Sequence, residues 1–519
     1  MRSLQDQART SNVPARGQAW GRAVNKSRPL TFRLVHTGGG LRLLGSTPAS
    51  TPKRVPHRGL LDSAQSVTLN IPMMDELLSD HTARRLRQLV AHAQRDCRLP
   101  SLVVAVGKHG RILDSVLLGS ADITTATAPG LDVQYRVGSI TKTFTAVGVM
   151  QLVAEGRIGL SDPIGRHWID APHPDLTIAS LLTHTSGLQR ESAAEPGSSG
   201  ALPSREELPG NAAAARLLYP SGYWWHYSNL GFALLGEVMA QICGQSWESR
   251  VTERILRPLG LERTTAFPQV PAAQGYSVRP FSDEIVAELP GDSGALAPAG
   301  QLWSTAADLT RWIHFLIRGN PEILPSTHLE LMRAPRVIAD LEHWTTAFGL
   351  GLVLRRQGER VFVGHIGAMP GFLAALLGST ASGNSVVLFT NSTAGIDIGQ
   401  LAADILELVE ADSVDLTPWQ PADQPPAEYE SVLGRWWSEW SEFLFRWRDG
   451  ELQSMAADAP AGTAPNRFRQ VRQDVFVTTS GAERGEELQL VRDASGLVVK
   501  MYHATYPLTR ATPQNDGTD

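Results

Sequence analysis

The segment from Ile140 to Val153 is apolar on almost every side when drawn as a helix, and it limits the possible folds more than any other part of the chain. Such a helix cannot lie on a protein surface and has to be enclosed by other elements. It is too short to cross a membrane, which takes about 20 apolar residues, and Gly156 supplies a stop signal just beyond it. The chain must therefore form a large domain around this helix.

The composition supports such a domain. Hydrophobic residues make up 42% of the 519 residues and charged residues 19%, which excludes a wholly disordered chain. A net charge of −5 argues against a polyanion-binding protein, so no nucleic acid partner is expected. The two cysteines, Cys97 and Cys243, are too few for a disulfide framework or a multi-cysteine zinc site. With no apolar run of membrane-spanning length and no recognisable secretory signal, we expect a cytoplasmic protein without a membrane span.

The first 74 residues differ from the rest. Residues 1–61 contain eleven Lys and Arg but a single acid, Asp6, among Gly, Pro, Ser and Thr without any periodicity. We therefore predict that residues 1–74 form a disordered basic leader. Two alternatives stay open: a tail that contacts nucleic acid or directs import, and upstream sequence that precedes a true start at Met73 or Met74.

Residues 75–412 have the pattern of one mixed domain. Thr82–Asp96 is predicted as an amphipathic helix, and two strands, Leu102–Val106 and Ile112–Leu118, as a hairpin that turns at Lys108-His109-Gly110. Further helices are predicted at Ile178–Leu182, Leu230–Cys243, Ala306–Ile317 and Ile398–Val409, and further strands at Leu350–Leu354, Val361–His365, Phe372–Leu377 and Ser385–Thr390. Strands at both ends with helices between them predict an α+β fold with one antiparallel sheet covered by helices.

Residues 413–426 contain four prolines and two aspartates, which predicts a linker. Residues 427–519 then show aromatic residues that partly alternate with polar ones, a turn at Asp449-Gly450 and further strand-like runs. This predicts a small all-β accessory domain, a meander or barrel. Its aromatic residues are expected to form a core rather than a ligand cage; they are Trp436, Trp437, Trp440, Phe443, Phe445 and Trp447.

The strongest chemical pattern is Ser139-Ile140-Thr141-Lys142, which opens the buried helix directly after Gly138. A spacing of three places the serine hydroxyl and the lysine amine on one helix face, and the helix N-terminus favours the alkoxide. Burial can lower the lysine pKa from about 10.4 until the neutral amine accepts a proton, so the pair supplies a nucleophile and its base. A second copy, Ser50-Thr51-Pro52-Lys53, lies in the leader and has a proline inside it.

Two further segments contain groups that could act with this pair. In Tyr227-Ser228-Asn229, a phenol beside an ammonium can have its pKa lowered and relay protons, and the asparagine can hydrogen-bond the lysine. The alternative is a helix N-cap. In His365-Ile366-Gly367-Ala368, at the end of a strand, the glycine indicates the close approach of a backbone or a substrate, whereas a lone histidine there is more often structural.

One competing pattern predicts a different nucleophile. Gly291-Asp292-Ser293-Gly294 is similar to the nucleophile segment of chymotrypsin-like proteases, but that fold needs two β-barrels with a histidine and an aspartate upstream, whereas this region is rich in helices. The sequence has no His-Glu-x-x-His motif and no glycine-rich phosphate loop, so no metal and no cofactor are predicted.

Taken in order, Ser-x-x-Lys, Tyr-Ser-Asn and His-x-Gly resemble the motifs of the serine β-lactamase and penicillin-binding protein superfamily, in its branch of class C β-lactamases, D-alanyl-D-alanine carboxypeptidases and esterases. The likeness covers about residues 80–410. It implies a β-lactamase/transpeptidase-like fold, with an antiparallel sheet flanked by helices and a helical lobe. Flanking segments match too: Tyr135-Arg136-Val137-Gly138, Leu160-Ser161-Asp162-Pro163, Leu182-Thr183-His184-Thr185-Ser186-Gly187-Leu188 and Leu302-Trp303-Ser304-Thr305-Ala306-Ala307-Asp308-Leu309.

The resemblance implies the catalytic roles. Ser139 would be the acylated nucleophile, Lys142 its base partner and Tyr227 the proton relay. The backbone N–H groups of Ser139 and Ala368 would form the oxyanion hole, whose donors stabilise the charge that develops on the attacked carbonyl.

The resemblance also implies that Asn229, His365 and Gly367 bind the substrate. His365 stands where dedicated β-lactamases of this branch have a lysine, which favours esters or amides over antibiotics. We therefore expect a serine hydrolase that acts through an acyl-enzyme on a small ester, peptide or β-lactam-like substrate. The alternative is a catalytically idle binding or regulatory protein that keeps the fold.

Overall fold

The computed structural model describes residues 77–191, 202–393, 395–412 and 424–511. The predicted leader at 1–74, with its Ser-x-x-Lys copy, and positions 413–423 of the predicted linker lie outside these ranges. Within the described residues, no helix combines the length and the apolar character needed to cross a bilayer.

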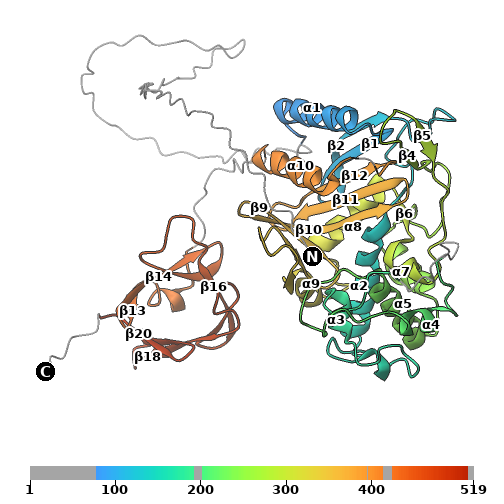
Figure 1. Cartoon of the computed structure of the whole chain (residues 1–519). Coiled ribbons are helices and arrows are strands. Elements are labelled where there is room, and N and C mark those ends of the chain that lie inside the picture. Colours follow the sequence, from blue (N-terminus) through green and yellow to red (C-terminus); the bar gives the residue numbers. More distant parts are fainter. Residues whose placement is uncertain (1–76, 192–201, 394, 413–423, 512–519) are drawn as a thin grey trace, which may run out of the picture. The chain divides into compact units, whose positions relative to one another are not determined.

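An eight-stranded antiparallel sheet is the centre of the larger part of the structure (Figure 1), with the order β2-β1-β12-β11-β10-β9-β8-β7. β1 pairs with β12, as in Val103 opposite Phe389, so the two ends of this part of the chain meet in one sheet, as predicted. The predicted strand at Leu350–Leu354 begins only at Val353, because a turn closed by Gly349 N–H and Leu352 C=O precedes it. The strands are β1 (Ser101–Lys108), β2 (Arg111–Gly119), β7 (Val337–Ile338), β8 (Thr346–Phe348), β9 (Val353–Gln357), β10 (Arg360–Met369), β11 (Phe372–Ser379) and β12 (Asn384–Thr390).

Alternating side chains of the sheet enter two separate hydrophobic cores. In β1, Leu102, Val104 and Val106 face the helices α1 (Asp80–Asp96) and α10 (Ile398–Asp412), which lie together on one face (Figure 1). Val103 and Ala105 face the other core, which α8 (Ala306–Arg318) and the helical region complete. A sheet covered on both faces needs apolar residues at every position, which explains the unbroken apolar run in β1.

Helix α2 (Thr141–Ala154) is enclosed on every side, as predicted from its sequence, and every residue from Thr141 to Leu152 is buried. The ring of Phe144 stacks on Trp312 at 3.9 Å, and the buried hydroxyl of Thr143 accepts a hydrogen bond from Trp312 Nε1 at 2.8 Å. The other helices of this region are α3 (Ile178–Leu182), α4 (Leu208–Ala213), α5 (Asn229–Cys243), α6 (Trp247–Val251), α7 (Ala297–Gly300) and α9 (Ser326–Arg333). Two short pairs of strands accompany them: β3 (Tyr135–Arg136) with β6 (Trp303–Ser304), and β4 (Tyr276–Val278) with β5 (Ile285–Ala287).

The C-terminal part is a closed barrel of eight antiparallel strands (Figure 1). Trp436 and Phe445 are buried in its core, as predicted for the aromatic run. Two residues of the run do not belong to this core: Trp437 is only partly buried, and Trp440 lies in the turn after β13 and is 69% exposed. The strands are β13 (Gly434–Ser438), β14 (Ser441–Arg448), β15 (Glu451–Ala456), β16 (Asn466–Arg472), β17 (Val475–Thr478), β18 (Glu487–Arg492), β19 (Val498–His503) and β20 (Tyr506–Thr509).

Candidate active site

Ser139 is the middle residue of a 3-10 turn, Gly138–Ile140, that leads directly into α2. Gly138 has a φ of +51°, a left-handed conformation that glycine adopts without steric cost. Lys142 lies in the first turn of α2, and its Nζ is 3.1 Å from Ser139 Oγ. The structure thus places the two side chains in contact, as their spacing predicts.

The Lys142 amine is fully buried and has three hydrogen-bond partners. Besides Ser139 Oγ, Nζ lies 2.7 Å from Asn229 Oδ1 and 2.8 Å from the carbonyl oxygen of Ala299. An ammonium would donate to all three oxygens, whereas a neutral amine has two N–H groups and one lone pair. The two carbonyl oxygens can only accept, so in the neutral form the lone pair is left for the Ser139 hydroxyl. Burial lowers the pKa of Lys142 well below its ordinary value, which favours this neutral form.

Strand β10 passes directly against the turn that holds Ser139. A Cβ atom at Gly367 would lie 1.9 Å from the Val137 carbonyl oxygen, and one at Gly138 would lie 2.8 Å from Ala368 N. Only glycine at these two positions lets the backbones approach so closely. This contact brings the backbones of Ser139 and Ala368 close together.

Tyr227 lies beside Lys142, with Nζ 4.8 Å from the centre of its ring, and its Oη is buried. The ring also stacks on the imidazole of His184, with 4.2 Å between the ring centres. Burial raises the pKa of the Tyr227 phenol, although the nearby Ser139 hydroxyl acts in the opposite direction. The expectation of a lowered phenol pKa is therefore wrong: desolvation of a phenolate outweighs the neighbouring polar groups, and the phenol keeps its proton.

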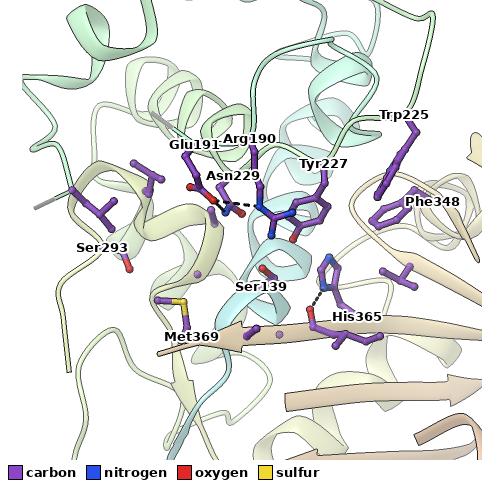
Figure 2. A pocket seen from close by; sticks show the side chains of 18 of the residues that line it. Ser139, Arg190, Glu191, Trp225, Tyr227, Asn229, Ser293, Phe348, His365 and Met369 are labelled. Atoms are coloured by element: carbon purple, nitrogen blue, oxygen red, sulfur yellow. Dashed lines mark hydrogen bonds and ion pairs between the residues drawn. The ribbon is translucent and has the colours of Figure 1, made fainter. Parts of the chain in front are cut away.

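A chain of hydrogen bonds runs from a surface carboxylate to the nucleophile. Asn229 Nδ2 donates to Glu191 Oε1 at 2.7 Å (Figure 2), while Asn229 Oδ1 accepts from Lys142, which contacts Ser139. Ser228 caps α5 by accepting from Gly231 N, so Ser228 fulfils the N-cap alternative while its neighbour reaches the site. The Asn229 amide is thus held by protein groups at both ends.

Arg190 and Glu191 form a charged pair at this side of the site. Arg190 Nε is 3.4 Å from Glu191 Oε1, and both side chains are more than half exposed. The Arg190 guanidinium also lies 5.0 Å from the centre of the Tyr227 ring. After burial, which dominates, Glu191 raises the pKa of Lys142 and Arg190 lowers it.

His365 is buried in β10, and its Nδ1 lies 2.7 Å from the carbonyl oxygen of Ile366. A carbonyl oxygen accepts only, so Nδ1 bears the proton and Nε2 has the free lone pair. Burial, with a contribution from Lys142, lowers the pKa of His365 to about 3. The imidazole is therefore neutral, but its one N–H is already used and only an acceptor remains for a substrate.

These groups surround one cavity of about 530 Å³, which Ser139, Tyr227, Asn229 and His365 all line (Figure 2). Of the described residues that line it, the buried Oη of Tyr227 and Nε2 of His365 have no hydrogen-bond partner. The cavity therefore offers unpaired polar atoms next to the Ser139 hydroxyl. Its remaining walls are largely apolar and include Leu202, Trp225, Leu296, Phe348, Val353, Ile366 and Met369.

Ser293 lines the same cavity but has different partners. Its Oγ accepts from Arg136 Nη2 at 3.1 Å, and its N–H donates to Gln301 Oε1 at 2.8 Å. No histidine or lysine in the described part of the chain is hydrogen-bonded to it. The surrounding fold, one large sheet with helices and two short pairs of strands, also differs from the two barrels that the protease interpretation requires.

Sequence reasoning missed several groups of this site. The Ala299 carbonyl is backbone and has no sequence signal. Arg190, Glu191 and Phe348 carry no recognisable pattern, and only the fold brings them to Ser139. His184 was quoted as part of a matching flank, which was the signal that could have found it.

A family model described as Beta-lactamase matches residues 86–410, more than half of the chain. The chain belongs to the Beta-lactamase family. A second model, described as a domain of unknown function, matches residues 425–510, which hold the strands of the barrel.

Relatives and solved structures agree with this assignment. Esterase EstB of Burkholderia gladioli is 30% identical over 310 residues, which cover 52% of this chain and 78% of the esterase. Beta-lactamase-like protein 2 of Dictyostelium discoideum is 28% identical over 281 residues, so the chain spans about half the length of that relative. The octameric penicillin-binding protein homologue from Pyrococcus abyssi matches with a TM-score of 0.57 and 21% identity, over 82% of this chain and 99% of its own. A D-stereospecific amidohydrolase from Streptomyces sp. matches with a TM-score of 0.54 and 27% identity, over 64% of this chain and 98% of its own. The fold is β-lactamase/transpeptidase-like.

Proposed function

We propose that residues 75–412 form a serine hydrolase domain that cleaves a small ester or amide through an acyl-enzyme on Ser139. Similarity to an esterase and to a D-stereospecific amidohydrolase supports the reaction type. The observation that carries the proposal is the surroundings of Lys142: two carbonyl oxygens take its N–H groups, and the remaining position at Nζ lies 3.1 Å from Ser139 Oγ.

In the first step, Ser139 Oγ attacks the substrate carbonyl carbon while its proton passes to Lys142 Nζ. The N–H groups of Ser139 and Ala368 stabilise the oxyanion that forms. When the tetrahedral intermediate collapses, the bond to the leaving alcohol or amine breaks, and this group takes the proton from Lys142. Water then attacks the acyl carbon, gives up a proton in the same way, and the acid leaves with Ser139 restored.

Tyr227 is proposed as the proton relay between Lys142 and the leaving group. A phenol that keeps its proton can act as a relay: its oxygen accepts a proton from one neighbour while its O–H gives a proton to another. Burial, which raises the pKa of Tyr227, supports a relay by the neutral phenol rather than a phenolate base.

The cavity favours a substrate without an obligatory carboxylate. Its walls are mainly apolar, and His365 is neutral with only an acceptor to offer. Among the described residues that line the cavity, Arg190 is the one arginine or lysine, and Glu191 already pairs with it. We therefore expect short acyl esters to be hydrolysed with a higher kcat/KM than cephalosporins.

The test is a panel of p-nitrophenyl acyl esters, D-amino acid amides and cephalosporins, assayed with the parent protein, Ser139→Ala and Ser293→Ala. We expect ester hydrolysis by the parent and by Ser293→Ala, and none by Ser139→Ala. Hydrolysis that persists in Ser139→Ala would exclude this nucleophile. A folded parent protein that hydrolyses nothing on the panel would favour the idle binding protein instead.

A further inference from the structure

The C-terminal barrel encloses a cavity of about 240 Å³ near one of its ends. Glu439 and Ala504 line it, and they lie in the turns that join β13 to β14 and β19 to β20. The other end is filled from within, because Tyr429, in the 3-10 turn Ala427–Tyr429, stacks on Trp447 at 5.6 Å. The hollow of the barrel therefore lies at the end that carries these two turns.

The hollow combines aromatic walls with negative charge. Phe443, Phe445 and Tyr506 supply the aromatic walls, and Glu439 and Glu483 the carboxylates. Of the described residues that line the cavity, none is a lysine or an arginine to balance the two carboxylates.

The neighbours of these groups leave the negative charge in place. Glu483 Oε2 accepts a hydrogen bond from Asn466 Nδ2 at 2.8 Å, which fixes the carboxylate without neutralising it. His503 also lines the cavity, but burial lowers its pKa, so it adds no positive charge at neutral pH. Its Nε2 is already hydrogen-bonded to Thr478 Oγ1 at 2.9 Å.

Ser454 provides an independent sign that the hollow takes a polar ligand. This residue is 2% exposed and lines the cavity. Its hydroxyl makes no hydrogen bond to any described residue and is not closed off from solvent, so it is open to a polar ligand that fills the hollow.

We propose that this cavity binds a small organic cation, an ammonium group on a short apolar body. Aromatic faces attract cations, and two carboxylates add to this attraction, since no lysine or arginine is among the described residues that line the cavity. The Ser454 hydroxyl can accept a hydrogen bond from the ammonium group. A volume below about 300 Å³ suits a ligand smaller than a drug molecule. The site is separate from Ser139 and does not depend on the proposed hydrolase function.

Ligand-observed NMR titration of the full chain tests the site with three probes of one shape: benzylammonium, benzyl alcohol and benzoate. We expect benzylammonium to bind at least tenfold more tightly than the other two. The double substitution Glu439→Gln with Glu483→Gln should weaken benzylammonium binding at least fivefold, and Tyr506→Ala should weaken it too. All three side chains are exposed, so the fold should tolerate these changes.

Matched controls locate the binding. Glu428→Gln and Trp440→Ala change an exposed acid and an exposed aromatic residue of the same part of the chain that do not line the cavity, and both should leave the Kd unchanged. Ser139→Ala and Glu191→Gln should also leave it unchanged. The proposal is wrong if benzoate or benzyl alcohol binds as tightly as benzylammonium, if benzylammonium does not bind, or if the double variant binds like the parent.

Discussion

The cavity beside α2 and the cavity in the barrel both have aromatic walls, but they differ in whether the charged groups around them are neutralised. Beside α2, the amine of Lys142 is buried and its pKa is lowered, and the carboxylate of Glu191 is paired with Arg190. In the barrel, Glu439 and Glu483 line a cavity that no lysine or arginine of the described chain shares.

This difference separates a site that reacts from a site that only binds. A base must lose its charge before it can take a proton, and the surroundings of Lys142 favour that loss. A binding site for a cation needs charge that its own neighbours do not cancel. The barrel cavity has such charge, and none of the described hydroxyl groups that line it is hydrogen-bonded to a histidine or a lysine, so we expect it to bind without catalysing a reaction.

Substitution of Lys142 should cause the largest loss of activity and so tests this comparison most strongly. Lys142→Met keeps an unbranched side chain of similar length but removes the base, so ester hydrolysis should fall by about 10³-fold. Lys142→Arg should be equally inactive, because arginine does not give up its proton. Benzylammonium binding by the barrel should stay unchanged in both. Steady-state kinetics on folded variants, verified by thermal unfolding, measure the effect, and turnover within tenfold of the parent would show that Lys142 is not the base.

A smaller loss is expected when β10 is moved away from Ser139. In Gly367→Ala the new Cβ would meet the Val137 carbonyl oxygen at 1.9 Å, so the backbone has to shift. A shift of about 1 Å at a reacting centre can cost roughly 10²-fold in rate. Gly210→Ala, whose Cβ would have no atom within 4 Å, is the control and should keep full activity. Equal kcat/KM values for the two variants would contradict the close contact.

Two charged side chains near Lys142, Glu191 and Arg190, should affect the pH dependence of kcat/KM in opposite directions. Hydrolysis requires neutral Lys142, so the acid limb of kcat/KM follows its pKa. Glu191→Gln removes a carboxylate that raises this pKa and should move the limb to lower pH, whereas Arg190→Gln should move it to higher pH. Both side chains are more than half exposed, so each shift should stay below about one pH unit. Shifts in the same direction would contradict the assignment of the limb to Lys142.

The smallest effect on the pH profile is expected at His365. With its pKa lowered to about 3, this imidazole stays neutral from pH 5 upward. His365→Gln should therefore change the rate by a constant factor and leave the shape of the kcat/KM profile unaltered. A limb between pH 6 and 7 that disappears in the variant would show that His365 is charged in the working enzyme.

The sequence predicted the parts of the site that depend on local spacing. Ser139 and Lys142 are three residues apart at a helix start, so the helix itself determines their contact. Six of the eight strands of the central sheet were also predicted, from their apolar runs, whereas the short strands β7 and β8 were not. The late start of β9 was missed, since a turn closed by one backbone hydrogen bond has no clear pattern in this sequence.

Contacts between distant segments could not be predicted in this way. The Ala299 carbonyl and Glu191 reach the site only through the fold, and the pKa of Tyr227 was predicted in the wrong direction because its burial is a tertiary property. The sequence predicted a small β domain with an aromatic core. It did not predict the hollow beside Ser454, because the size of a cavity depends on how side chains from distant strands pack together.

The rate at which a fluorophosphonate labels the protein, measured by mass spectrometry between pH 5 and 9, tests the pairing of Ser139 with a neutral Lys142 most directly. Peptide mapping should find the label on Ser139 alone, at a rate that rises with pH along a single limb and then levels off. In Lys142→Met the rate should be about 100-fold lower and show no such limb. Labelling of Ser293, or labelling of Lys142→Met at the rate of the parent protein, would contradict the account.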